Sequence, residues 1–203
     1  MTKYIYIIRH GETEYNKLQI MQGRSINIGL NETGKKQGDL FYKKYKNIPF
    51  DIVITSELKR SQETVQEFTE KIPHIVDERI TEISWGANEG KPMDKSVTLR
   101  FKKMIQEWSN GNLDYSIPGG ETGKSLANRL QSFVQDLRNR EEKYILVCTH
   151  GRALKMLITK LLNQSINMME KYKHSNTGLY LFKQKGESII LIEENNIEHL
   201  LSS

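Results

Sequence analysis

Arginine and histidine side chains follow three separate runs of apolar residues, in a pattern that suits an anion. Arg9 and His10 come directly after residues 4–8, Arg60 comes shortly after a second apolar run, and His150 closely follows a third. An arginine beside a histidine is a poor metal site, because the guanidinium adds positive charge where a cation would bind. Guanidinium and imidazole groups instead match the charge and hydrogen-bonding geometry of an oxyanion.

A phosphoryl group suits these residue types, because its transfer depends mainly on positioning and charge stabilisation. Arg9 and Arg60 are expected to bind its oxygens through planar, charged guanidiniums. His10 is the candidate nucleophile, since a free imidazole has a pKa of about 6.5 and nearby arginines favour its neutral form. His150 is expected to hold another phosphoryl oxygen, with a protonated ring as one option. A helix that begins after Gly151 would add the positive end of its dipole.

Breaking the bond to an ester oxygen also requires a proton donor, and a carboxylic acid with a raised pKa can serve. Glu82 is the candidate, because it precedes the glycine-bearing loop of residues 85–90. Glu78 and Glu89 lie close to it in the sequence and remain as alternatives.

Apolar runs alternate with amphipathic stretches along the chain, which predicts an α/β fold. Strands are expected at residues 4–8, 51–55, 75–76 and 144–148, with a C-terminal hairpin at 179–182 and 189–192. Helices are expected at residues 33–46, 58–68, 96–108, 126–137 and 154–161. The expected architecture is a three-layer sandwich, a mostly parallel sheet with helices on both faces and a small inserted subdomain. The three motifs should then converge at one edge of the sheet, where the strands end.

The chain of 203 residues is long enough for a substantial core and is expected to form a single domain, residues 1–203. Residues 84–122 differ in character, because they contain both tryptophans and two of the four prolines. They are expected to be an insertion over the sheet edge that determines specificity.

The composition is that of an ordinary globular protein with a slight excess of positive charge. Thirty Lys and Arg against 25 Asp and Glu give a net charge of +5, which suits an anionic substrate. The charges are interspersed, so a nucleic-acid partner is not predicted. The single cysteine, Cys148, leaves no intramolecular disulfide and favours a reducing cytoplasm. The N-terminal apolar run is too short for a signal peptide and no stretch approaches a membrane span, so no membrane partner is expected. Both a monomer and a homodimer remain open.

The sequence resembles the histidine phosphatase superfamily, also called the phosphoglycerate mutase-like family, at six motifs that occur in the family's order. They are Arg9-His10-Gly11-Glu12-Thr13 with Asn16, Gln22-Gly23-Arg24, Ser56-Glu57-Leu58-Lys59-Arg60-Ser61-Gln62-Glu63-Thr64, residues 82–90, Pro118-Gly119-Gly120-Glu121-Thr122, and Thr149-His150-Gly151. The resemblance implies a phosphohistidine on His10 and a phosphoryl contact from Asn16. It also implies substrate contacts from Gln22 and Gly23, a phosphate contact at Gly151, and no metal or other cofactor.

Two departures favour the phosphatase branch over the mutase branch. The insertion lacks the paired arginines that phosphoglycerate mutases use on the substrate carboxylate and second phosphate, and the chain is short for that branch. The expected enzyme is a metal-independent histidine acid-type phosphatase that hydrolyses a small phosphorylated metabolite. A sugar phosphate, phosphoserine, phosphoglycerate and a ribazole-type nucleotide all remain open as that metabolite. A phosphoglycerate mutase and a non-catalytic phosphate-ligand binding module are the alternative functions.

Several polar residues outside the motifs have two interpretations each. Arg152 is expected to face solvent on its helix, with contact to a second anionic group as the alternative. His174 is expected to be solvated rather than to reach the pocket, and His74 and His199 are expected on the surface or in loops. Asn176 precedes the last hairpin, where it could line the site.

Overall fold

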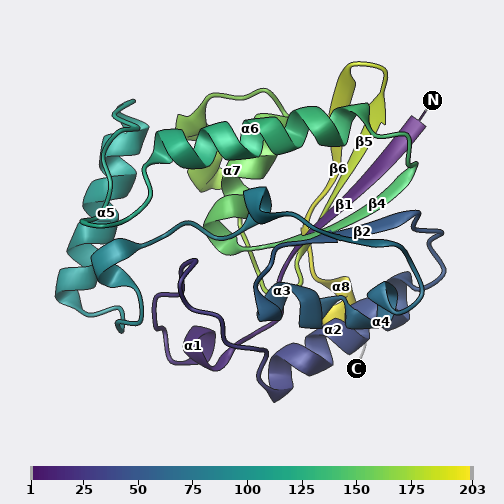
Figure 1. Cartoon of the computed structure of the whole chain (residues 1–203), viewed down its shortest axis with the longest axis horizontal. Helices are drawn as coiled ribbons and strands as arrows, with labels where there is room; N and C mark the ends of the chain where they lie inside the picture. Colours follow the sequence, from purple (N-terminus) through teal and green to yellow (C-terminus); the bar gives the residue numbers. More distant parts are fainter. Residues whose placement is uncertain (1, 202–203) are drawn as a thin grey trace.

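The fold is built on a six-stranded mixed sheet, shown by the computed structural model, which describes residues 2–201 (Figure 1). The strands are β1 (Thr2–Arg9), β2 (Ile52–Thr55), β3 (His74–Val76), β4 (Tyr144–Thr149), β5 (Leu179–Lys185) and β6 (Ser188–Asn196). They lie in the order β3-β2-β4-β1-β5-β6. The first four strands pair in parallel, and β5 and β6 add in antiparallel orientation. The predicted mostly parallel sheet and C-terminal hairpin are confirmed.

Helices cover both faces of the sheet, which gives the predicted three layers. The α-helices are α1 (Glu14–Lys17), α2 (Glu32–Tyr45), α3 (Lys59–Thr64), α4 (Gln66–Thr69), α5 (Lys95–Ser109), α6 (Gly123–Asn139), α7 (Gly151–Leu161) and α8 (Glu198–Leu201). Short 3-10 helices form η1 (Glu78–Ile80), η2 (Gly86–Asn88) and η3 (Ile166–Lys171). In Figure 1, α6 and α7 lie on one side of the strands, and α2, α4 and α8 lie on the other.

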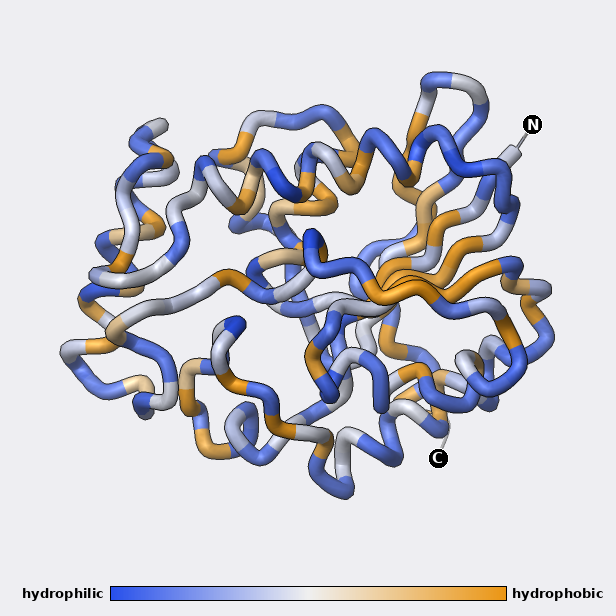
Figure 2. The backbone as a smooth tube through the Cα atoms, in the orientation of Figure 1, coloured by the Kyte–Doolittle hydropathy of each residue, from blue (hydrophilic) through white to orange (hydrophobic). Residues whose placement is uncertain are grey.

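Alternate side chains of the central strands enter two separate apolar cores, because successive residues of a strand point to opposite faces. Ile7 of β1 belongs to the core under α6 and α7, with Leu130 and Leu157. Ile8 belongs to the opposite core, with Phe41 of α2. The tube in Figure 2 is accordingly apolar along the central strands. Within residues 2–201, no helix combines the length and the apolar character that crossing a membrane needs.

Polar residues determine where the longer helices begin. Asn31, Asp94 and Thr122 precede α2, α5 and α6, and each side chain accepts a hydrogen bond from the backbone N–H three residues further on. This satisfies an amide that has no partner within its helix. α5 begins and ends within one residue of its predicted bounds, and it lies with η2 inside residues 84–122. That this segment determines specificity stays a prediction.

The prediction for His199 is wrong, because α8 folds back against α2 and buries this side chain to 2% exposure. The His199 Nε2 atom lies 2.9 Å from Oγ1 of Thr177. Thr177 has a positive φ of 53°, which is strained for a β-branched residue, and its N–H donates to the carbonyl of Arg9 at 3.0 Å. The C-terminal helix therefore supports the strand end that carries Arg9. His74 is exposed, as predicted.

Burial lowers the pKa of His199 to about 4, which makes stability depend on pH. The unfolded chain binds a proton on this ring near pH 6.5, while the folded protein does not until about pH 4. The free energy of unfolding should therefore fall as the pH decreases from 6.5 towards 4. In His199→Gln, urea unfolding between these pH values should show a pH dependence reduced by about one proton per molecule. An unchanged pH dependence would contradict this assignment.

Candidate active site

A pocket of about 230 Å³ opens where β1 ends and α7 begins. Its walls come from the loop after β1, from residues 84–122, from the first turn of α7 and from the segment before β5. The lining residues are Arg9, His10, Tyr15, Asn16, Gln19, Ile20, Met21, Gln22, Glu82, Trp85, Met93, Phe101, Gly151, Arg152 and His174. A wider depression of about 770 Å³ lies near the opposite ends of β2 and β4, and contains none of the motif residues.

Six of the nine predicted site residues line this pocket, namely Arg9, His10, Asn16, Gln22, Glu82 and Gly151. The other three, Arg60, His150 and Gly23, are buried outside its lining and contact the lining residues or one another. The His10 and His150 rings lie 5.1 Å apart between centroids. The convergence of strand ends brings the motifs together as expected, but in two layers.

His10 is held as a neutral ring with a free Nε2 atom. Its Nδ1 lies 2.7 Å from the Gly11 carbonyl, which can only accept, so Nδ1 carries the proton and Nε2 has the lone pair. Burial, with added contributions from Arg60 and Arg9, lowers the pKa of His10 well below its ordinary value of 6.5. A buried imidazole in this tautomer is prepared to act as a nucleophile at neutral pH.

His150 has the opposite tautomer. Nε of Arg60 donates to its Nδ1 at 3.2 Å, so the proton is on Nε2, which lies 2.7 Å from Oγ of Ser56. Burial, reinforced by Arg60, lowers the pKa of His150 well below 6.5. The protonated form considered for His150 is therefore excluded in this state, because a proton on Nδ1 would face the arginine.

Arg60 joins the second strand end to the loop after α1. Its guanidinium is fully buried and donates to the carbonyls of Ile26 at 2.5 Å and Gly23 at 3.3 Å, besides His150. Burial lowers the pKa of Arg60 to about 10, so it stays charged at neutral pH. Gly23 thus supports Arg60 from behind the pocket.

The prediction that His174 is solvated is wrong, because this ring lines the pocket beside Arg9. Nη1 of Arg9 lies 3.2 Å from Nδ1 of His174 and donates to the His174 carbonyl at 2.9 Å. Burial and then Arg9 lower the pKa of His174 to about 4, so the ring is neutral with its proton on Nε2. The sequence could have indicated this contact, because His174 precedes β5, and β5 pairs with β1, the strand that ends at Arg9.

Glu82 lies at the pocket wall with its carboxylate against the first turn of α7. One oxygen accepts from the backbone N–H of Arg152 at 3.0 Å, and the other from Ala153 at 3.0 Å and Ile83 at 3.0 Å. Glu78 is exposed, and Glu89 instead contacts the Trp85 amide. Of the three candidate carboxylates, only Glu82 lines the pocket.

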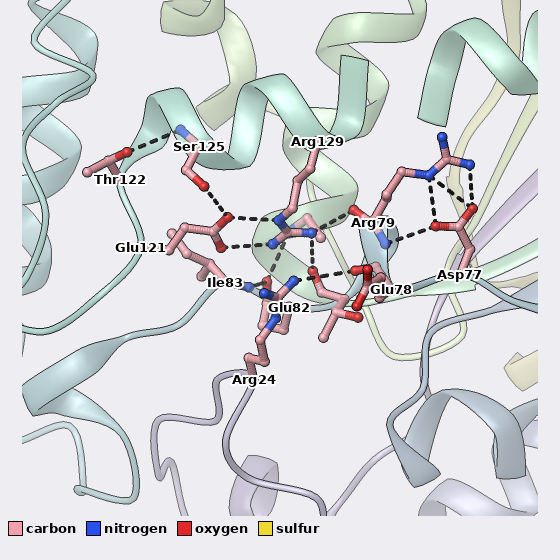
Figure 3. A network of polar contacts seen from close by, with 12 residues as sticks. Arg24, Asp77, Glu78, Arg79, Glu82, Ile83, Glu121, Thr122, Ser125 and Arg129 are labelled. Carbon is pink, nitrogen blue, oxygen red and sulfur yellow. Dashed lines mark hydrogen bonds and ion pairs between the residues drawn. The ribbon is translucent and has the colours of Figure 1, made fainter. Parts of the chain in front are cut away.

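Two arginines fix the segment that carries Glu82 to α6 (Figure 3). Arg129 forms a two-pronged ion pair with Glu121 at 2.8 and 2.9 Å, and its Nη1 donates to the carbonyls of Arg79 at 2.6 Å and Thr81 at 2.8 Å. Arg79 pairs with Asp77 at 2.6 Å and also with α6. The residues just before Glu82 are thereby held against α6.

The smaller predicted contacts are arranged around the loop after β1. Oδ1 of Asn16 accepts from the N–H of Thr13, and the amide of Asn176 donates to the His10 carbonyl at 2.8 Å. One end of the Gln22 amide contacts Oγ1 of Thr13 at 2.7 Å, while its Oε1 is buried without a partner among residues 2–201. Gln22 therefore has one unused hydrogen-bond acceptor, Oε1, at the pocket.

The prediction that Arg152 faces solvent is also wrong. Its residue is 6% exposed, lines the pocket and forms an ion pair with Glu170 of η3. Its guanidinium carbon lies 5.3 Å from the Phe101 ring and 5.9 Å from the Trp85 ring. The apolar lining, Tyr15, Ile20, Met21, Trp85, Met93 and Phe101, was not predicted residue by residue. In the sequence, the two tryptophans were the only indication that their segment, residues 84–122, contributes to the site.

The family model described as "Histidine phosphatase superfamily (branch 1)" matches residues 5–197. "Fructose-2,6-bisphosphatase TIGAR" of Xenopus tropicalis is 34% identical over 137 residues, 64% of this chain and 48% of that protein. "Probable phosphoglycerate mutase GpmB" of Yersinia pestis is 28% identical over 178 residues, 86% of this chain and 82% of that protein. The solved phosphoserine phosphatase of Entamoeba histolytica, in complex with 3-phosphoglyceric acid, is 27% identical with a TM-score of 0.83, covering 98% of this chain and 99% of that chain.

The two central histidines should keep opposite neutral tautomers in solution. ¹⁵N spectra of the imidazoles at pH 7.5 and 5.5 should show Nδ1–H for His10 and Nε2–H for His150, because burial and the arginines disfavour a second proton. The variants His10→Ala and His150→Ala would assign the two signals. A doubly protonated ring at either position, or the same tautomer at both, would contradict the geometry.

Proposed function

The chain belongs to the histidine phosphatase superfamily, branch 1, and from this premise we propose that it is a metal-independent phosphomonoesterase acting through a phosphohistidine on His10. The observation that carries the proposal is the tautomer of His10, whose Nδ1–H donates to Gly11 and whose Nε2 lone pair is free at the pocket. A nucleophile must be unprotonated, and here its neutral state follows from burial beside two cations.

In the first half of the proposed reaction, Nε2 of His10 attacks phosphorus and the bond from phosphorus to the ester oxygen breaks. Glu82 gives its proton to that oxygen, which leaves as an alcohol. In the second half, water attacks the phosphohistidine, Glu82 takes the proton from the water, and the phosphorus–nitrogen bond breaks. His10 is then neutral again, and inorganic phosphate is the product.

Negative charge on the phosphoryl oxygens would be stabilised by Arg9 and Asn16 at the pocket surface and by Arg60 and His150 behind His10. Direct contact of Arg60 or His150 with an oxygen, as expected from the sequence, would require each to exchange a present partner, Gly23 or Ser56. We therefore assign Arg60 chiefly to the electrostatic field around His10, and His150 chiefly to holding Arg60 in place.

A cysteine phosphatase mechanism is not supported by the chain's single thiol. Cys148 is fully buried in β4, and burial raises the pKa of its thiol to about 12. It is therefore protonated at neutral pH and unreactive. We place the activity in a reducing cytoplasm, in which such a cysteine stays free.

The proposed substrate is a small phosphorylated metabolite, in keeping with relatives named for phosphoserine and fructose 2,6-bisphosphate. A mutase would share the phosphohistidine and differ only in the acceptor, which would be a second substrate hydroxyl instead of water. The relative named as a phosphoglycerate mutase makes isomerisation of 3-phosphoglycerate a necessary parallel assay.

His10→Ala should lower kcat/KM for p-nitrophenyl phosphate by at least about 10³-fold, because it removes the nucleophile. His74→Ala is the matched control, an exposed histidine outside the pocket, and should keep wild-type activity. Excess chelator should leave the wild-type rate unchanged. Activity that persists in His10→Ala, or that the chelator abolishes, would overturn the proposal; phosphate transfer to a second hydroxyl without release would indicate the mutase.

Glu82→Gln should slow hydrolysis of an alkyl phosphate by about 10²-fold, because an alkoxide leaves poorly without a proton. Single-turnover phosphorylation of His10 by p-nitrophenyl phosphate should change much less, since nitrophenolate leaves without protonation. Glu78→Gln is the control, because Glu78 is exposed and does not line the pocket. An equal loss with both substrates would assign Glu82 a structural role instead of the acid role.

A further inference from the structure

We propose that Arg152 forms a second anion-binding subsite in the pocket, and that the preferred substrates are phosphomonoesters whose leaving group carries a carboxylate. This inference rests on the proposed phosphatase function and adds the class of its substrate. It starts from a charged side chain that the catalytic scheme does not use.

The guanidinium of Arg152 is placed to bind a ligand in the pocket. Only its Nη1 has a partner among residues 2–201, the carboxylate of Glu170, so Nε and Nη2 are available at the pocket wall. The rings of Phe101 and Trp85 lie on the guanidinium, 5.3 and 5.9 Å from its central carbon, and fix its orientation. An oriented guanidinium with two spare N–H groups matches the fork of a carboxylate.

The charge around Arg152 is not balanced. Glu170 also pairs with Lys155, whose Nζ lies 3.0 Å from its second oxygen. Two buried cations therefore share one carboxylate, and the cluster carries one positive charge in excess. A cation in a poorly solvated position gains from an additional anion, and the open side of this cluster is the pocket.

The charge of the outer pocket favours a carboxylate over other leaving groups. Ile20, Met21 and Met93 form apolar walls, Tyr15, Gln19 and Gln22 add hydrogen-bonding groups, and Arg9 and Arg152 are the arginines of the lining. A neutral sugar would leave the excess positive charge of the Arg152 cluster without an anion. A second phosphate would bring about two negative charges to a cluster with one positive charge in excess, whereas a carboxylate brings one.

Two matched pairs of substrates isolate the carboxylate. 3-Phosphoglycerate and glycerol 3-phosphate differ by a carboxylate in place of a hydroxymethyl group, and O-phosphoserine and O-phosphoethanolamine differ by the carboxylate alone. The wild type should favour the carboxylated member of each pair by about 10- to 100-fold in kcat/KM, the range expected for a charged hydrogen-bonded pair. A ratio near one in both pairs would overturn the subsite.

Two variants should change this ratio in opposite directions. Arg152→Gln should bring it near one, whereas Glu170→Gln should raise it, because Arg152 loses its competing carboxylate. Lys160→Gln is the matched control, since it removes a cation from the same helix outside the pocket and should keep the wild-type ratio. If Arg152→Gln fails to fold, Glu170→Gln alone decides: an unchanged or lower ratio contradicts the subsite.

Calorimetric titration of His10→Ala with the same four compounds separates this inference from the proposed function. Tighter binding of the carboxylated members, lost in His10→Ala/Arg152→Gln, supports the subsite even if the wild type hydrolyses nothing. Equal binding of the members of each pair overturns the subsite even if hydrolysis proceeds.

Discussion

The buried guanidinium of Arg60 is the constraint on which the rest of the site depends. A cation removed from water is costly, and among residues 2–201 no carboxylate contacts it. Its partners are all neutral acceptors: Nδ1 of His150 and the carbonyls of Ile26 and Gly23. Arg60 therefore requires a lone pair on His150, and its field helps to keep His10 unprotonated. The packing of one arginine thus constrains the loop after α1 and the tautomer of one histidine, and it adds to the burial that keeps the other histidine neutral.

The first turn of α7 makes two contributions to the pocket. Its backbone amides hold the carboxylate of Glu82, which in turn caps the helix. The side chain of Arg152, on one of those same residues, reaches the outer pocket. The same helical turn thereby holds Glu82, the proposed acid, and carries Arg152, the proposed second cation. The distance between the phosphate end and the leaving-group end of the pocket is fixed as a result.

The sequence predicted the sheet and the approach of Arg9, His10, Arg60 and His150 well, because buried parallel strands are short apolar runs and their ends must meet. The sequence did not predict that Arg152 is buried. Residues 151–159 of α7 are all buried, so no periodicity in the sequence separates a buried face from an exposed one. The partner Glu170 lies 18 residues further on, beyond the reach of local patterns. The burial of His199 was missed for a related reason. α8 is only one turn long, and His199 is buried only because α8 contacts α2.

The place of β1 in the sheet has a consequence for synthesis of the chain. β1 lies between β4 and β5, so the first of the six strands along the chain has both of its neighbours after residue 143. Until residues 144–185 follow, an apolar strand with two unpaired edges persists, a state that exposes the nascent chain to aggregation. Contacts so distant in sequence also form slowly. A fragment that ends before residue 144 would leave β1 without either of its neighbouring strands, and the sheet edge that carries Arg9 and His10 would lack its support.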